Sequence, residues 1–242
     1  MLNTSERALL DLIRSARQTG RLLDISEEPE GVDLDGAYRV QAALLEGQEL
    51  RGYKIGLISP AKQAQMGIDK PIYGRVTASM LLESPVSLGR FRQPRIEPEL
   101  AVVLREDLPP DATPGAARLA VGAVFLAVDI LDSVWQGYRC SIVGLVADNA
   151  SGGGFLLGER ALPLRLEGEL RLYLNGELLT EGPLGALGNP EERLCWLARA
   201  TGGLRAGQVI FLGAPAASVP ARSGVLEVHG PEGSLLLARL DP

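Results

Sequence analysis

The hydrophobic period of this sequence changes near Gly52, from a helical period to the pattern of short strands. Before Gly52, apolar residues recur with helical spacing over residues 4–20 and 33–47, and Thr4 or Ser5 can cap the first of these helices. After Gly52, the apolar runs are short enough for buried strands and are separated by turn residues. The order of helices followed mostly by strands predicts an α+β fold with a mixed, curled sheet.

Turn signals mark element boundaries in the second part of the chain. Asn175-Gly176 lies between two apolar runs and is the dipeptide favoured in two-residue β-hairpins, because both positions take positive φ. Ser59-Pro60 places a capping side chain before a proline at the first helical position, which predicts the start of a helix. The pair at positions 189–190 repeats this pattern and predicts a second helix start.

Composition and charge exclude several classes of function. The net charge is −6 with both signs spread along the chain, so nucleic acid and anionic membrane surfaces are not expected partners. No apolar run is long enough to span a bilayer. Cys140 and Cys195 lie far apart, which is typical of a reduced, cytoplasmic protein. No linker or repeat interrupts the chain, so we expect a helical N-terminal region over residues 1–50 and a mixed-β domain over residues 51–242.

The segment at residues 95–104 (RIEPELAVVL) is the most informative, because it places two acids at the entrance of an apolar strand. Glu97 and Glu99 are two residues apart and therefore point to the same face of an extended chain. Carboxylates this close repel each other unless a cation or a proton lies between them. Asp129 lies inside a second apolar run, where an unpaired charge is costly to bury.

These three acids have a functional and a structural interpretation. A solvated strand end for Glu97 and Glu99, and backbone hydrogen bonds for Asp129, would need no ligand. If the three carboxylates meet, they form an all-oxygen site that suits Mg²⁺ or Mn²⁺. Zinc is disfavoured, because the only histidine is His229 and the cysteines are isolated.

Several segments resemble the bacterial 2-keto-4-pentenoate (2-hydroxypentadienoate) hydratases and 4-oxalocrotonate decarboxylases, a branch of the fumarylacetoacetate hydrolase superfamily. The main ones are residues 52–59 (GYKIGLIS), 67–74 (GIDKPIYG), 95–104 (RIEPELAVVL), 127–133 (AVDILDS) and 146–151 (VADNAS). Each motif is weak alone, but together they follow the family's order and spacing over nearly the whole chain. The resemblance implies a β-sandwich-like roll after the helical region, with residues 51–242 as the catalytic domain.

The resemblance also implies roles for individual residues. Glu97, Glu99 and Asp129 match the family's metal ligands, with Asp129 standing where hydratases usually carry Glu. Lys54 matches the active-site lysine, and it would transfer protons if partial burial near the metal lowers its pKa. Substrate binding falls to Leu57, Asn149 and Ser151, and Ser151 joins Lys54 as a catalytic residue. Arg75, Arg95 and Arg139 are candidates for binding a second substrate carboxylate.

Two positions depart from the family pattern. Ile72 stands where the hydratases usually carry an acid before the aromatic residue, and Ile58 replaces their threonine. If that acid carries a proton during water addition, this chain lacks it. Decarboxylation of the 4-oxalocrotonate type, or binding of a 2-oxo acid without catalysis, therefore stays open beside hydration.

The implied function is a Mg²⁺- or Mn²⁺-dependent lyase that adds water to a short 2-hydroxydienoate or 2-oxoalkenoate in aromatic meta-cleavage catabolism. The metal would act as a Lewis acid on a chelating 2-oxo acid. A homo-oligomer and a hydratase–decarboxylase complex are the assemblies that the resemblance implies. A carbon–carbon hydrolase that activates water with an early histidine is disfavoured, because no histidine precedes His229.

Overall fold

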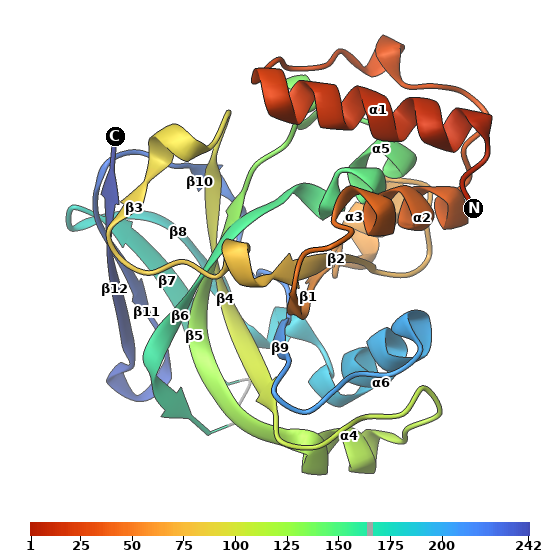
Figure 1. The fold of residues 1–242 in the computed structure, drawn as a ribbon. Helices are drawn as coiled ribbons and strands as arrows, with labels where there is room; N and C mark the ends of the chain where they lie inside the picture. Colours follow the sequence, from red (N-terminus) through yellow and green to blue (C-terminus); the bar gives the residue numbers. More distant parts are fainter. Residues whose placement is uncertain (164–166) are drawn as a thin grey trace.

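Two mixed β-sheets form the body of the computed structural model, which describes residues 1–163 and 167–242, and the N-terminal helices gather at one end (Figure 1). The larger sheet has the strand order β2 (Ile72–Thr77), β1 (Leu50–Gly56), β9 (Val209–Phe211), β4 (Arg95–Leu104), β5 (Val121–Leu131) and β6 (Gly152–Leu162), and β10 (Val219–Pro220) pairs with β4. The smaller sheet has the order β3 (Val86–Ser87), β12 (Leu235–Asp241), β11 (Gly224–His229), β7 (Glu169–Leu174) and β8 (Glu177–Pro183). This architecture confirms the predicted α+β fold with a mixed, sandwich-like arrangement of strands.

The α-helices have 6–16 residues, and two of them begin at caps predicted from the sequence. The α-helices are α1 (Thr4–Thr19), α2 (Leu34–Leu44), α3 (Pro60–Gln65), α4 (Pro114–Ala120), α5 (Ile142–Ala147) and α6 (Pro190–Thr201). The 3₁₀ turns are η1 (Ile25–Glu27), η2 (Ala78–Met80), η3 (Leu88–Arg90), η4 (Gln136–Tyr138), η5 (Asn149–Ser151), η6 (Leu184–Leu187) and η7 (Pro231–Gly233). Ser59 caps α3 and Asn189 caps α6, and each is followed by proline, as the sequence predicts.

The cap of α1 differs from the prediction. Asn3, and not Thr4 or Ser5, is the N-cap, because its side chain accepts a hydrogen bond from the amide of Glu6 at 2.9 Å. The Glu6 carboxylate in turn accepts the amide of Asn3 at 3.0 Å, which completes a capping box. Thr4 and Ser5 therefore lie inside the first turn.

Apolar side chains join the N-terminal helices to the rest of the chain. Leu9 and Ile13 of α1 and Val40 of α2 share one buried cluster with Trp135 and with Val146 of α5. Figure 1 shows these helices together beside the β1–β2 end of the larger sheet. None of the helices in the described residues has the length and apolar character that crossing a bilayer requires.

Alternation along β4 and β5 separates two environments. Leu100, Val102 and Leu126 belong to the core that also contains Leu172 and Leu226 of the smaller sheet. The opposite face of the same strands carries a smaller cluster around Phe155 and Phe211, and it continues into the acidic residues described below. Successive residues of a strand point to opposite faces, so the carboxylates and the inter-sheet core are separated by the sheet itself. The predicted hairpin is also present, since Asn175 and Gly176 join β7 and β8 with φ of 51° and 80°.

Candidate active site

Strand register brings the three predicted acids together. Glu97 of β4 lies directly opposite Asp129 of β5, and Glu99 is two residues further along the same face. One carboxylate oxygen from each of the three lies within 4.8 Å of the others. Glu99 and Asp129 are fully buried, whereas Glu97 is half-buried. The solvated interpretation is therefore wrong for Glu99, and within the described residues Asp129 accepts no backbone hydrogen bond.

Burial and mutual repulsion disfavour the ionised form of these acids. Desolvation, followed by the charges of Asp129 and Glu97, raises the pKa of Glu99 well above its ordinary value. Desolvation and the neighbouring Asp129 raise the pKa of Glu97 to about 7. The pKa of Asp129 is raised by desolvation, although the Lys54 ammonium opposes this shift. A cation bound among the three carboxylates would offset both their desolvation and their mutual repulsion, and would therefore favour the ionised form.

Lys54 of β1 supplies one positive charge at the cluster. Its Nζ lies 2.6 Å from Oδ2 of Asp129 and donates a hydrogen bond to the carbonyl of Ala150 at 3.0 Å. Desolvation acts to lower the pKa of Lys54, but the charges of Asp129, Glu97 and Glu99 outweigh it, and the net pKa is raised. In the protein without a bound cation the three acids therefore outweigh burial, because they face a single ammonium group.

The donor set fits a hard divalent cation. Among the described residues, Oε1 of Glu99 and Oδ1 of Asp129 are buried and accept no hydrogen bond. The other oxygen of Glu99 accepts the amide of Gly213 at 2.9 Å, which orients the carboxylate. Buried carboxylate oxygens without a partner are costly, and a Mg²⁺ or Mn²⁺ ion would coordinate them. The three acids include neither histidine nor cysteine, so the set is not typical of zinc.

The turn η5 borders the cluster in an unusual backbone conformation. Asn149, Ala150 and Ser151 have φ of 57°, 50° and 56°, a left-handed run that costs roughly 1–2 kcal/mol per residue. Oδ1 of Asn149 accepts the amide of Arg75 at 2.7 Å, and Nδ2 donates to the carbonyl of Arg75 at 2.9 Å. The Asn149 side chain thus attaches the turn to β2, and its predicted contact with substrate stays a prediction.

Two further predicted site residues lie close to Lys54 in the chain or in space: Leu57 follows it by three residues, and Ser151 follows Ala150, whose carbonyl accepts the hydrogen bond from Lys54. Ser151 is 3% exposed, and within the described residues its Oγ has no hydrogen-bond partner, so the hydroxyl is free to bind a ligand. Leu57 follows β1 with a φ of 52°, and its carbonyl accepts a hydrogen bond from Nε2 of Gln63 at 2.8 Å. The roles assigned to both residues stay predictions.

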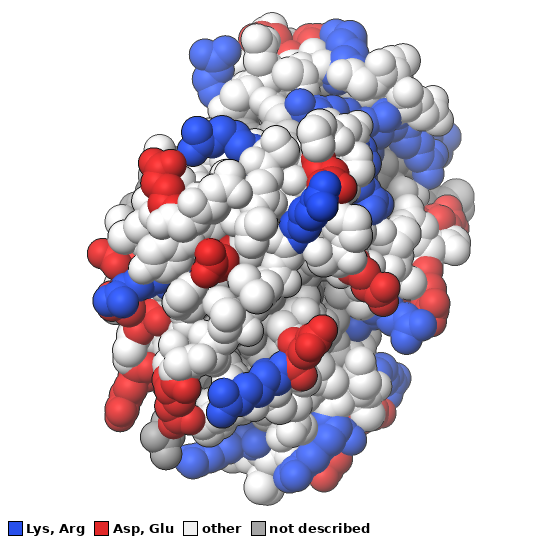
Figure 2. All heavy atoms as spheres, turned by 90° about the vertical axis from the view of Figure 1, so that its left-hand side faces the viewer, with Lys and Arg blue, Asp and Glu red and all other residues white. Residues whose placement is uncertain are grey.

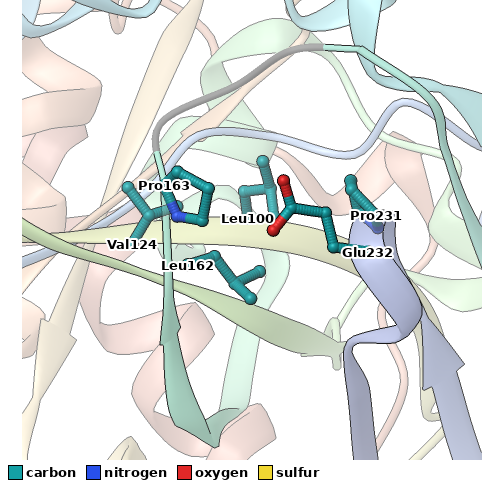
Figure 3. Close-up of a pocket in the computed structure, with 6 residues that line it drawn as sticks. All are labelled: Leu100, Val124, Leu162, Pro163, Pro231 and Glu232. Atoms are coloured by element: carbon teal, nitrogen blue, oxygen red, sulfur yellow. The ribbon is translucent and has the colours of Figure 1, made fainter.

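A separate pocket lies on the other face of the sheet. Figure 3 shows it between Leu100, Val124 and Leu162 of the larger sheet and Pro231 with Glu232 of η7. Leu100 follows Glu99 directly, so alternation turns its side chain away from the carboxylates. This mainly apolar pocket therefore belongs to the space between the sheets and not to the acidic site.

Sequence comparison decides the family. The model of the family described as fumarylacetoacetate (FAA) hydrolase C-terminal matches residues 51–235. The chain belongs to this family. It is 34% identical over 240 residues to 2-keto-4-pentenoate hydratase 1 of Dechloromonas aromatica (strain RCB), a match covering 91% of this chain and 90% of that protein.

The chain is similar to family members that catalyse different reactions, because its relatives include a decarboxylase as well as hydratases. It is also 34% identical, over 198 residues, to a 4-oxalocrotonate decarboxylase of Pseudomonas sp, covering 78% of this chain and 76% of that protein. The structure of 4-oxalocrotonate decarboxylase from Pseudomonas putida G7, complexed with magnesium and adipate, matches with a TM-score of 0.87 and 28% identity over 98% of both chains. The suspected family is therefore confirmed.

The two departures from the family pattern occupy different surroundings. Ile72 is 2% exposed and packs in the cluster formed with the N-terminal helices, so its position offers no proton carrier. Ile58 lies in the segment after β1, and its side chain covers Gly213 so closely that a Cβ at residue 213 would lie 2.6 Å from it. Gly213 also has a φ of 94°, which glycine adopts without strain.

Two residues of the site were missed by sequence reasoning. Gly213 follows β9 and orients Glu99 through its amide, and a glycine after an apolar run was the only signal for it. Arg193 of α6 donates hydrogen bonds to the carbonyls of Leu212 and Ile58 at 3.2 and 3.5 Å. It resembles an ordinary helix charge in the sequence, so only the structure places it beside the site.

Proposed function

We propose that this protein is a divalent-metal-dependent lyase that adds water to a short 2-hydroxydienoate or 2-oxoalkenoate in aromatic meta-cleavage catabolism. The observation that carries the proposal is the buried cluster of Glu97, Glu99 and Asp129 beside Lys54. Its relatives include hydratases and a decarboxylase, all of which are lyases by name. The relatives named hydratases support water addition as the reaction.

Glu97, Glu99 and Asp129 would hold the cation, with Mg²⁺ or Mn²⁺ favoured by their oxygen donors. When bound, the cation supplies a Lewis acid for a 2-oxo acid and offsets the negative charge that keeps Lys54 protonated. The amide of Gly213 holds Glu99 in place, and the ion pair with Lys54 holds Asp129. These contacts orient two of the three carboxylates before any ligand arrives.

Lys54 is the proposed proton carrier. Its Nζ is buried and fixed between Asp129 and the carbonyl of Ala150, so a proton is held at a defined position. Ser151 follows Ala150, and its unpaired hydroxyl would orient the substrate next to that proton. Apolar side chains around the cluster, including Phe155 and Phe211, limit the access of bulk water to this face.

Oxalate binding tests the metal site directly, because oxalate chelates a cation as a 2-oxo acid would. We expect oxalate to bind the wild-type protein only in the presence of Mg²⁺ or Mn²⁺, as measured by isothermal titration calorimetry. Glu99→Gln should abolish this binding, whereas Glu106→Gln, an exposed acid beyond the same strand, should leave it intact. Equal oxalate binding by wild type and Glu99→Gln would refute the proposal.

Decarboxylation is the second candidate, and the apolar surroundings of Ile72 favour it. A reaction that releases CO₂ needs an electron sink at the 2-oxo group but no acid to activate water. An assay that follows CO₂ release from 4-oxalocrotonate and water addition to 2-hydroxypentadienoate in parallel distinguishes the two. Oxalate binding without either reaction would identify a non-catalytic 2-oxo-acid-binding protein.

We further propose that the protein works in the cytoplasm as a homo-oligomer. A hydratase–decarboxylase complex is a second assembly that the family suggests. The face shown in Figure 2 supports an oligomer, because uncharged surface lies between its scattered acidic and basic side chains. The smaller sheet contributes the exposed Val225, Leu235 and Leu237. Both cysteines are free, in agreement with a reducing compartment.

A further inference from the structure

Arg193 lies in the first turn of α6, with its guanidinium where three segments meet. It donates to the carbonyl of Ile58 after β1 and to the carbonyl of Leu212 after β9. The ideal Cβ of Gly188 would lie 3.3 Å from its Nη2, so the glycine leaves room for the guanidinium. The side chain therefore adopts a defined position although it is only partly buried.

A single peptide group separates Arg193 from the acidic cluster. The Leu212–Gly213 peptide accepts a hydrogen bond from Arg193 through its oxygen and donates one to Glu99 through its nitrogen. Arg193 and Glu99 also interact electrostatically across this peptide. The guanidinium and the Glu99 carboxylate therefore lie one peptide group apart, and a short dicarboxylic acid bound to both would have to bridge this distance.

The charge of Arg193 is not neutralised within the described residues. Arg17 and Arg92 form ion pairs with Asp148 and Asp132, whereas the hydrogen-bond partners of Arg193 in the described residues are main-chain carbonyls only. A guanidinium has five N–H donors, so most of those of Arg193 remain open to a ligand. Its place near the start of α6 is also unfavourable for a cation, because the helix dipole is positive there.

The arginines considered from the sequence are engaged elsewhere. Arg95 donates to the hydroxyl and to the carbonyl of Ser218. Arg75 lies opposite Tyr53, whereas Lys54 lies opposite Gly74, so Arg75 points to the face away from the carboxylates. Arg139 is exposed and acts on Asp24 in the N-terminal region.

We propose that Arg193 binds the distal carboxylate of a dicarboxylic 2-oxo acid and makes this chain prefer dicarboxylic over monocarboxylic substrates. The inference rests on the proposed function, since it takes the three carboxylates as the place of the 2-oxo acid end. A guanidinium binds a carboxylate through two parallel hydrogen bonds, a geometry that lysine cannot reproduce.

Two saturated acids of equal length test the proposal without turnover: 2-oxoadipate and 2-oxohexanoate, titrated calorimetrically into the protein with Mg²⁺. We expect wild type to bind 2-oxoadipate about 10- to 150-fold more tightly, the ratio typical of a hydrogen bond to a charged group. Arg193→Met should reduce this ratio to about one, and Arg193→Lys should give an intermediate ratio. Arg199→Met, on the exposed last turn of the same helix, should keep the wild-type ratio.

Other results of these titrations would overturn the inference. The wild-type titration alone keeps the proposal testable if Arg193→Met does not fold. Equal affinity of the wild-type protein for the two acids, or no binding of either acid, would overturn the inference. A preserved preference in Arg193→Met, or an equal loss of affinity for both acids, would assign Arg193 a structural role. Arg193-dependent binding of 2-oxoadipate by a protein that hydrates no dienoate would refute the proposed reaction and leave this inference standing.

Discussion

Two segments border the acidic cluster, and the structure holds them very differently. The strained loop (Asn149–Ser151) is buried at all three residues and is attached to β2 and to Lys54 by hydrogen bonds. The outer segment, residues 57–65, contains α3, which has no buried residue. Gln63 and Arg193 donate the side-chain hydrogen bonds to the main chain of its first two residues.

This difference separates a fixed side of the site from a movable one. A left-handed run of non-glycine residues persists only where the surroundings over-determine it. A segment with few buried contacts opens at a low free-energy cost, and such segments commonly admit substrate. We therefore expect substrate to enter beside the outer segment, while the strained loop keeps its conformation. Four predictions test this comparison.

The largest effect should follow Asn149→Ala, which removes both hydrogen bonds to the peptide of Arg75. Two polar groups lose their partners, at about 1–3 kcal/mol each, so the free energy of unfolding should fall by about 2–5 kcal/mol. Urea denaturation followed by circular dichroism measures the change. A loss below about 1 kcal/mol, smaller than one such group should cost, would show that the loop is not held by this side chain.

Metal binding should stabilise the protein more at pH 8 than at pH 6. The folded pKa of Glu97, about 7, lies above its ordinary value, so its contribution to stability is present below about pH 4.5 and is lost as the pH rises through 7. A cation needs the ionised carboxylate and therefore competes with the proton below pH 7. At 100 times the Kd, the cation adds ~2.7 kcal/mol, and melting temperatures with and without Mg²⁺ measure it. An equal shift at both pH values contradicts the prediction.

Gly74→Ala should destabilise the strained loop without removing a hydrogen bond. The added Cβ would lie 2.6 Å from the main-chain oxygen of Asn149, and such overpacking costs about 1–3 kcal/mol. Gly185→Ala is the matched control, because no atom lies within 4 Å of its Cβ position. The urea midpoint of Gly74→Ala should be lower than that of Gly185→Ala. Equal midpoints would contradict a close approach of residue 74 to the main chain of Asn149.

The smallest effect on stability should follow Gln63→Ala in the outer segment. It removes one partly buried hydrogen bond to Leu57, which is worth about 0.5–1.5 kcal/mol. Because the segment borders the entrance, KM should rise, while the urea midpoint should fall by less than it does in Asn149→Ala. If Gln63→Ala destabilised the protein as much as Asn149→Ala, the contrast between the two segments would be lost.

Local patterns in the sequence were sufficient for the fold class and for the pairing of Glu97 with Glu99 on one face. The hairpin at Asn175-Gly176 and the caps Ser59 and Asn189 depend on adjacent residues, so they too were predictable. Asp129 required the register of β4 against β5, which only the family resemblance supplied. The cap of α1 was misplaced by one residue, because Asn3, Thr4 and Ser5 all have capping side chains.

Effects that depend on tertiary charge were not predictable in the same way. Burial alone predicts a lowered pKa for Lys54, and the opposite shift arises because two neighbouring strands bring three acids to its ammonium group. Arg193 offered no local signal, since its neighbours in α6 include the ordinary exposed charge Glu192. Its position became visible only when the Leu212–Gly213 peptide was seen between it and Glu99.

The pairing of Glu97 with Asp129 also makes the site a reporter of correct assembly. If β4 and β5 paired one residue out of step, the acids would change faces or lose their opposite partner. An insertion or deletion within these strands should therefore abolish activity, and selection would remove it. Length changes in descendants of this chain would then be confined to its connecting loops. Cation binding by a refolded sample would show that β4 and β5 of the larger sheet are paired in the correct register, which a measurement of secondary-structure content cannot show.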